Sequence, residues 1–146
     1  MTTRGKVPDL VVVDASFVLR FVLHGKAPRP HPQGLTMLGH AELIVPALWN
    51  SEVANALVQA ERRGTATAGR IGEAMAVING LEPIVDNHVV DVTRNTEVAR
   101  AYGVSAYDAL YIELALRRKA ALATYDAGMI AAAKSAGIRL FPAPAA

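Results

Sequence analysis

Two aspartates directly follow apolar runs that predict buried β-strands. Asp14 comes after Leu-Val-Val-Val at residues 10–13, and Asp126 comes after Ala-Leu-Ala-Thr-Tyr at residues 121–125. Each carboxylate could cap the helix expected after it by accepting backbone N–H hydrogen bonds, or could act as a functional group at the carboxyl edge of a sheet. Both aspartates are expected at the same edge, which favours a shared functional site.

Two further acidic residues are expected on helices. Asp108 lies three residues after Ser105 in "SAYDALYIELAL", a segment that is apolar on nearly every side and therefore predicts a buried helix. The two residues have the form of a capping box, although Glu or Gln is usual at the second position, and anions are stabilised at a helix N-terminus. Glu52 shares one narrow helical arc with Asn55 and Gln59, which is the stripe that any amphipathic helix presents to water. Spacing alone therefore favours an exposed Glu52 without a special role.

Carboxylates gathered at one sheet edge would form a site of hard oxygen ligands. Such ligands suit Mg²⁺ or Mn²⁺ better than zinc, and the chain has no cysteine that could supply a thiolate. Without a metal the packed carboxylates would repel and raise one another's pKa, so a divalent cation would also relieve that repulsion. These residue types therefore indicate chemistry that depends on a bound cation.

The elements that must position these residues alternate between strand and helix. The apolar runs predict strands over residues 10–13, 42–46, 82–86, 120–126 and 138–141. The helical periodicity predicts helices over residues 16–23, 47–63, 65–80, 89–102, 105–118 and 127–136. Prolines in residues 24–34 predict a loop instead. Strands alternating with helices imply right-handed crossovers and a parallel sheet with helices on both faces, so the predicted fold class is α/β, a three-layer α/β/α sandwich.

Composition sets the limits of the fold and of its location. The 146 residues fit one domain, residues 1–146, with a short loose tail at 142–146, and the 52% of hydrophobic residues argue for a compact core. No stretch has the length of a membrane span and no apolar segment of a signal peptide precedes the first strand, so we expect a soluble cytoplasmic protein without membrane contact. The net charge of +2 is too small to name a nucleic-acid partner by itself.

The four acidic segments together resemble a known family. In order and spacing, "VVVDAS", "NSEVANAL", "SAYDALYIELA" and "LATYD" are similar to the four acidic motifs of the PIN-domain nucleases, most closely the VapC-type toxins of type II toxin–antitoxin systems. The resemblance extends from Asp9 to Phe141. It places four residues at the acidic catalytic positions and four at the polar positions that accompany them, namely Asp14, Glu52, Asp108 and Asp126, and Ser16, Asn55, Ser105 and Thr124, respectively.

The resemblance implies a Mg²⁺- or Mn²⁺-dependent endoribonuclease toxin that cleaves cellular RNA with a metal-activated water. Asp14, Asp108 and Asp126 would be the metal ligands, and Glu52 would bind the metal directly or through water. The family also implies a PIN-like fold, a homodimer and a cognate antitoxin protein that inhibits the toxin. The helices within residues 35–63 are the candidates for the apolar surface that would bind the antitoxin.

RNA must approach this negative site, so a basic rim is expected. The candidates for that rim are Arg20, Lys26, Arg29, Arg62 and Arg63. Solvated helix ends are the alternative interpretation of these charges. Tyr107 and Tyr111 lie one turn apart beside Asp108, and packing is favoured for both over base stacking.

Other functions fit the acidic residues less well. The segment "DASFV" faintly resembles the aspartyl-phosphate site of haloacid-dehalogenase phosphatases, but Ser16 stands where the second aspartate of that pattern would be. A response-regulator receiver domain would need an acidic pair near the first strand and a late lysine at a strand end. A PIN-like module that binds RNA or an antitoxin with weak or no cleavage remains an alternative.

Overall fold

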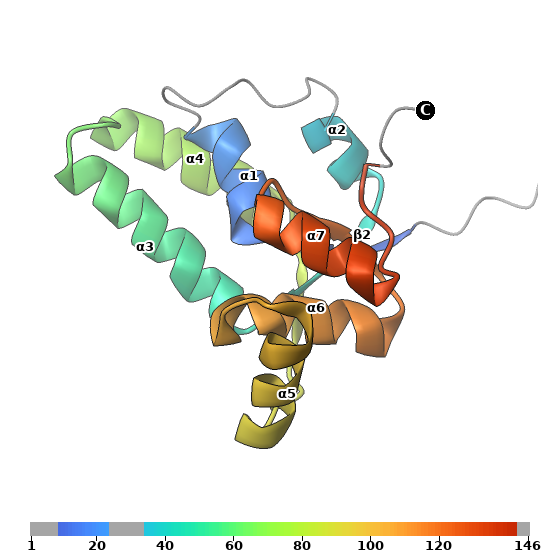
Figure 1. The fold of residues 1–146 in the computed structure, drawn as a ribbon. Helices are drawn as coiled ribbons and strands as arrows, with labels where there is room; N and C mark the ends of the chain where they lie inside the picture. The colour runs from blue at the N-terminus through green and yellow to red at the C-terminus, as the bar shows by residue number, and fades with distance from the viewer. Residues whose placement is uncertain (1–8, 24–33, 143–146) are drawn as a thin grey trace, which may run out of the picture.

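The computed structural model describes residues 9–23 and 34–142, and within them four strands form one parallel sheet (Figure 1). The strands are β1 (Leu10–Val13), β2 (Glu42–Pro46), β3 (Ile84–Asp86) and β4 (Ala121–Ala123). Their order across the sheet is β3-β2-β1-β4, so β1 is central and pairs in parallel with both β2 and β4. The carboxyl ends of these strands therefore lie along one edge, as predicted.

Seven helices surround this sheet within the described residues. They are α1 (Ala15–Val22), α2 (Gly34–Gly39), α3 (Leu48–Arg62), α4 (Ala68–Gly80), α5 (Val92–Tyr102), α6 (Ala106–Arg118) and α7 (Ala127–Ala136). Helix α6 packs along β1, β2 and β4 and contacts α5 and α7, whereas α1 packs against α3 and α4. The fold is the predicted three-layer α/β/α sandwich.

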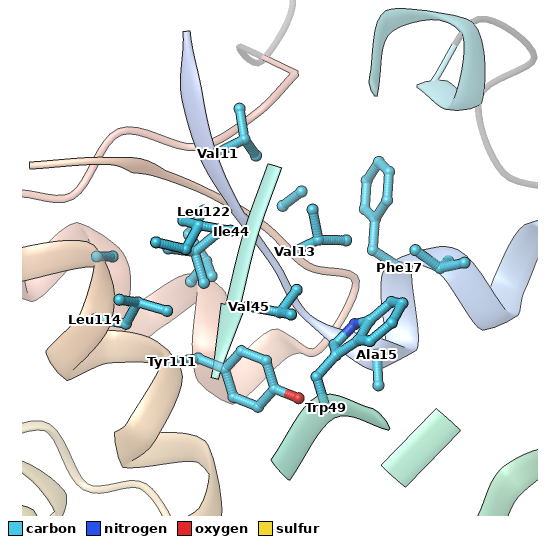
Figure 2. Packing of buried hydrophobic residues seen from close by; sticks show 14 of the residues in the cluster. Val11, Val13, Ala15, Phe17, Ile44, Val45, Trp49, Tyr111, Leu114 and Leu122 are labelled. Atoms are coloured by element: carbon cyan, nitrogen blue, oxygen red, sulfur yellow. The ribbon is translucent and has the colours of Figure 1, made fainter. Parts of the chain in front are cut away.

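The core confirms the prediction of a strand covered on both faces. Val11, Val12 and Val13 are all buried although successive side chains of a strand point to opposite sides, which requires a helical layer on each side. Trp49 of α3 and Tyr111 of α6 belong to the same buried core, and the Tyr111 hydroxyl points toward Ala15 at the start of α1 (Figure 2).

Helix boundaries follow local backbone chemistry. Helices α5 and α7 end at Gly103 and Gly137, which adopt the left-handed conformation that glycine takes without steric cost. Helix α4 begins at Ala68, later than the predicted residue 65, because the Thr67 side chain accepts a hydrogen bond from the Arg70 N–H and caps the helix there. Helix α5 likewise begins at Val92, after the capping Asp91, and not at residue 89.

The structure adds one helix that was not predicted and lacks one predicted strand. Residues 34–39 form the short helix α2. The sequence predicted a loop up to Gly34 and assigned no secondary-structure element to residues 35–39. Residues 138–141 form no strand; only Leu140 makes an isolated parallel bridge with Leu122 of β4, after which Pro142 cannot donate a further backbone hydrogen bond.

Some predictions concern residues that the structure does not describe. Lys26 and Arg29, the loop at residues 24–33 and the tail at 143–146 lie outside the described residues. Among the helices that are described, none has the length and apolar character needed to cross a bilayer.

Candidate active site

Asp14 follows β1 at the centre of the sheet edge and is almost completely buried, with 6% of its surface exposed. Its Oδ2 accepts hydrogen bonds from Ser16 Oγ at 2.6 Å and from Thr124 Oγ1 at 2.8 Å. Its side chain makes no capping bond to the backbone of α1. Asp14 is therefore oriented by two neighbouring hydroxyls, and the helix-cap alternative does not hold for it.

Asp126 lies after β4, which pairs directly with β1. Its Oδ1 accepts a hydrogen bond from the Met129 N–H at 2.8 Å and so caps α7. The Thr124 hydroxyl that donates to Asp14 also accepts from the Asp126 N–H at 3.1 Å. The cap interpretation therefore holds for one oxygen of Asp126, while Thr124 connects its backbone to Asp14.

Asp108 stands in the first turn of α6, and Ser105 caps that helix by accepting from the Asp108 N–H at 3.1 Å. Burial raises the pKa of the Asp108 carboxyl, and the negative charges of Asp14 and Asp126 raise it further, against the opposing effect of the Ser105 hydroxyl. The predicted helix cap at Ser105 is confirmed. The pKa of the Asp108 carboxyl depends on the charges of Asp14 and Asp126, which follow two neighbouring strands.

Glu52 is only partly exposed on α3 and differs in this from the expectation of an ordinary solvent-facing glutamate. Its Oε1 accepts a hydrogen bond from the Tyr111 hydroxyl at 3.0 Å. Burial raises the pKa of Glu52, and the charges of Asp14 and Asp108 add to this, whereas the Tyr111 bond lowers it. The structure thus joins Glu52 electrostatically to the same group of carboxylates.

Tyr111 contacts this site, although the sequence assigned it only to packing. It is fully buried, and its pKa is raised strongly by burial and by the charges of Glu52 and Asp14, which keeps the hydroxyl protonated as a donor. Packing is therefore right for Tyr111 but wrong for Tyr107, which is 67% exposed. The sequence could have placed Tyr111 near the site, because it lies three residues after Asp108 and residues three apart share a helix face.

The structure also describes four other residues of the predicted site, namely Asn55, Arg20, Arg62 and Arg63. Asn55 is exposed one turn along α3 from Glu52. The Arg20 guanidinium lies 4.7 Å from the centre of the Tyr125 ring, and that ring stacks on Phe17. Arg62 and Arg63 lie at the opposite end of α3 from Glu52, with both residues exposed.

The comparisons with known proteins identify the family and the fold. The PIN domain family matches residues 11–135, which include all four acidic residues. The chain belongs to the PIN domain family. PIN domains are generally metal-dependent nucleases, usually with divalent ions. The fold is also similar to that of PAE2754 from Pyrobaculum aerophilum, with a TM-score of 0.65 and 22% identity, over 90% of this chain and 85% of that chain. No curated protein matches the chain in sequence.

The donor set of this PIN domain suits a hard cation, but its side chains do not form a closed cage. Within the described residues, no three Asp, Glu or His side chains form a group that could hold a metal ion as they stand. Mg²⁺ usually keeps several waters and binds proteins through one or two carboxylates, so it does not need such a cage. Burial raises the pKa of Glu52 and of Asp108, and the charges of neighbouring carboxylates add to both shifts, so a bound cation would favour their ionised forms.

Proposed function

We propose that this PIN domain is a Mg²⁺- or Mn²⁺-dependent endoribonuclease of the VapC toxin type, which hydrolyses phosphodiester bonds of cellular RNA. The observation that carries the proposal is the electrostatic coupling of carboxylates from different elements. Burial is the largest cause that raises the pKa of Glu52 and of Asp108; the charge of Asp14 adds to both shifts, and the charge of Asp126 adds to that of Asp108. Carboxyl groups with raised pKa values at the carboxyl edge of a parallel sheet are typical of a functional site.

Each residue of the site has a distinct proposed role. Asp14 would be the central metal ligand through Oδ1, because both of its hydrogen bonds within the described residues go to Oδ2. Asp108 and Asp126 would complete the protein ligands, and Glu52 would bind the ion directly or hold one of its waters. A bound divalent ion supplies a water of lowered pKa and neutralises phosphate charge. Ser16 and Thr124 orient Asp14, and Ser105 orients Asp108.

The toxin assignment includes a cognate antitoxin and a homodimer. Large apolar side chains are exposed on two elements within residues 35–63, namely Met37 of α2 and Val58 of α3. We propose that the antitoxin binds on this part of the chain. Co-purification of the chain with the product of an adjacent gene, and mass measurement of the free chain, test these two partners directly.

The activity is tested by incubating purified protein with total cellular RNA and with a matched single-stranded DNA. We expect discrete RNA fragments that require Mg²⁺ or Mn²⁺ and disappear with EDTA. Asp14→Asn keeps the shape of the side chain but removes its charge, so it should lower cleavage by about 100-fold or more. Glu97→Gln is the matched control, because Glu97 is an exposed carboxylate on α5 and its loss should leave cleavage unchanged.

A non-cleaving binding module is the second candidate, because the described carboxylates do not form a ready metal group. This alternative predicts that the wild type binds RNA or the antitoxin but gives the same weak cleavage as Asp14→Asn. Calorimetric titration with Mn²⁺ separates the two candidates. A wild type that binds no Mn²⁺ and cuts no RNA would exclude the nuclease and leave the binding module.

A further inference from the structure

A cavity of about 560 Å³ lies beyond the carboxylates, between the end of α1, the second half of α3 and the start of α4. Its apolar lining includes Leu23, Ala56, Ala60 and Ala66. Figure 1 shows α3 and α4 as a hairpin of helices that extends from the sheet, with α1 beside it, and α1 contacts both helices. We call this cavity the hairpin pocket.

The polar lining of the hairpin pocket is basic. Arg63 and Arg70 contribute two guanidinium groups and Gln59 contributes an amide, and among the described residues that line the pocket none is acidic. Within the described residues neither arginine has an ion pair, in contrast to Arg117, which is bound by two carboxylates. Two guanidiniums around one cavity, neither ion-paired to a described residue, favour an anionic ligand, and guanidinium geometry matches the paired oxygens of a phosphate.

The hairpin pocket is connected to the carboxylates by one face of α3. Glu52, Asn55 and Gln59 follow one another at spacings of three and four, so they lie along one stripe of the helix. Gln59 and Arg63, four residues later, line the pocket. Eleven residues separate Glu52 from Arg63, which at about 1.5 Å per residue places the pocket roughly 16 Å along the helix from the site.

We infer that the hairpin pocket binds a backbone phosphate of the single-stranded RNA substrate, a few nucleotides away from the bond that is cleaved. This inference rests on the proposed function, because it assigns the pocket to the same substrate. The polar stripe leads the strand from the carboxylates to the two guanidiniums, and the N-terminus of α4 at Thr67 adds partial positive charge. The pocket thereby offsets the repulsion that RNA meets at the acidic edge.

The test compares the wild type with the Arg63→Gln/Arg70→Gln double variant on two substrates. On a long single-stranded RNA, the variant should lose about tenfold in kcat/KM. The dependence of log Kd on log salt, measured in EDTA, should become shallower by about 0.7 for each phosphate that the variant no longer neutralises. On a dinucleotide, which cannot reach from the carboxylates to the pocket, the variant and the wild type should cleave equally.

Arg118→Gln/Lys134→Gln is the matched control, because it also removes two exposed positive charges. These residues stand in the last turns of α6 and α7, at the opposite ends of these helices from Asp108 and the capping Asp126. The inference is overturned if the pocket variant binds and cleaves long RNA like the control, or if it loses the same activity on the dinucleotide. In both cases the proposed nuclease still stands, whereas a wild type that neither binds nor cuts RNA would overturn both proposals.

Discussion

The Tyr111 hydroxyl positions Glu52 and stabilises its charged form by donating a hydrogen bond at 3.0 Å. Tyr111→Phe removes this donor, so the pKa of Glu52, already raised by burial, should rise further. A hydrogen bond to a charged group contributes roughly 1.5–3 kcal/mol, so cleavage should fall about tenfold or more at slightly acidic pH and recover at alkaline pH. The measurement is the pH profile of kcat/KM.

Tyr107→Phe is the control for this prediction, because Tyr107 is on the same helix but is mostly exposed. Its pH profile should match that of the wild type. A Tyr111→Phe profile that is lowered equally at every pH would show that the tyrosine supports only the packing of α6, and would contradict a role in the ionisation of Glu52.

Asp108 should reduce the stability of the metal-free protein. Burial and the charges of Asp14 and Asp126 raise its pKa, so its ionised form is less favourable in the folded than in the unfolded chain. Asp108→Asn should therefore raise the metal-free melting temperature near neutral pH by about 2 °C, a small effect because the group is partly exposed and screened. Calorimetry with and without Mn²⁺ measures this; a lower melting temperature in EDTA would contradict it.

At the scale of residues, the sequence predicted the groups that chemistry recognises by type, but not their environments. Asp14, Asp108 and Asp126 were candidates on the sequence alone because a predicted strand or cap precedes each of them. The contact between Glu52 and Tyr111 joins residues 59 positions apart, so it depends on the packing of α3 against α6. Periodicity in one helix carries no information about such a partner.

Among the secondary-structure elements, β3 and α6 are joined by an ion-pair network. Arg117 Nη2 lies 2.6 Å from Asp86 Oδ2, and Arg117 Nε lies 2.9 Å from Glu113 Oε1, with the Glu113 side chain only 4% exposed. Arg117→Met would leave two close carboxylates without their cation. It should lower the free energy of unfolding by about 2 kcal/mol, less than for a fully buried network because the arginine side chain is partly exposed.

Arg118→Met provides the comparison for urea unfolding, since Arg118 is exposed and its replacement should change stability by less than about 0.5 kcal/mol. Equal stability of the two variants would contradict a structural role of the network.

Unfolding at acidic pH gives a second test of the network. Burial acts to raise the pKa of Asp86, but the hydrogen bond and charge of Arg117 outweigh it and lower that pKa. The contribution of Asp86 is therefore present above its ordinary pKa of about 4 and is lost at lower pH.

The helices and strands that were predicted correctly are those whose signals are local. Neighbouring residues alone are enough to predict the helix caps at Ser105 and Asp126. The same holds for the helix ends at Gly103 and Gly137. Residues 138–141 have the apolar composition of a strand, yet they make only one bridge, because pairing depends on a neighbouring strand that is itself only three residues long. Element type could thus be predicted better than element pairing.

For the molecule as a whole, the proposed cation would connect four elements that otherwise meet with like charges. Asp14 precedes α1, Glu52 is on α3, Asp108 is on α6 and Asp126 precedes α7. A ligand that binds only the folded state stabilises it by about 2.7 kcal/mol at 100 times its dissociation constant. Saturating Mn²⁺ should therefore raise the melting temperature by roughly 5–10 °C in a domain of this size.

The same shift should depend on pH in a direction that the carboxyls determine. The pKa values of Glu52 and Asp108 are raised in the folded chain, so the metal-free protein loses stability as pH rises from their ordinary values through the raised ones. Mn²⁺ requires the ionised forms, so its binding should release protons and tighten over that interval. The increase in melting temperature caused by Mn²⁺ should therefore be larger at about pH 7.5 than at about pH 5.

Calorimetric titrations with Mn²⁺ in buffers of different ionisation enthalpy would count the released protons. Glu97→Gln should behave like the wild type and Asp14→Asn should show no shift, whereas a shift independent of pH would mean that Mn²⁺ binds somewhere other than these carboxylates.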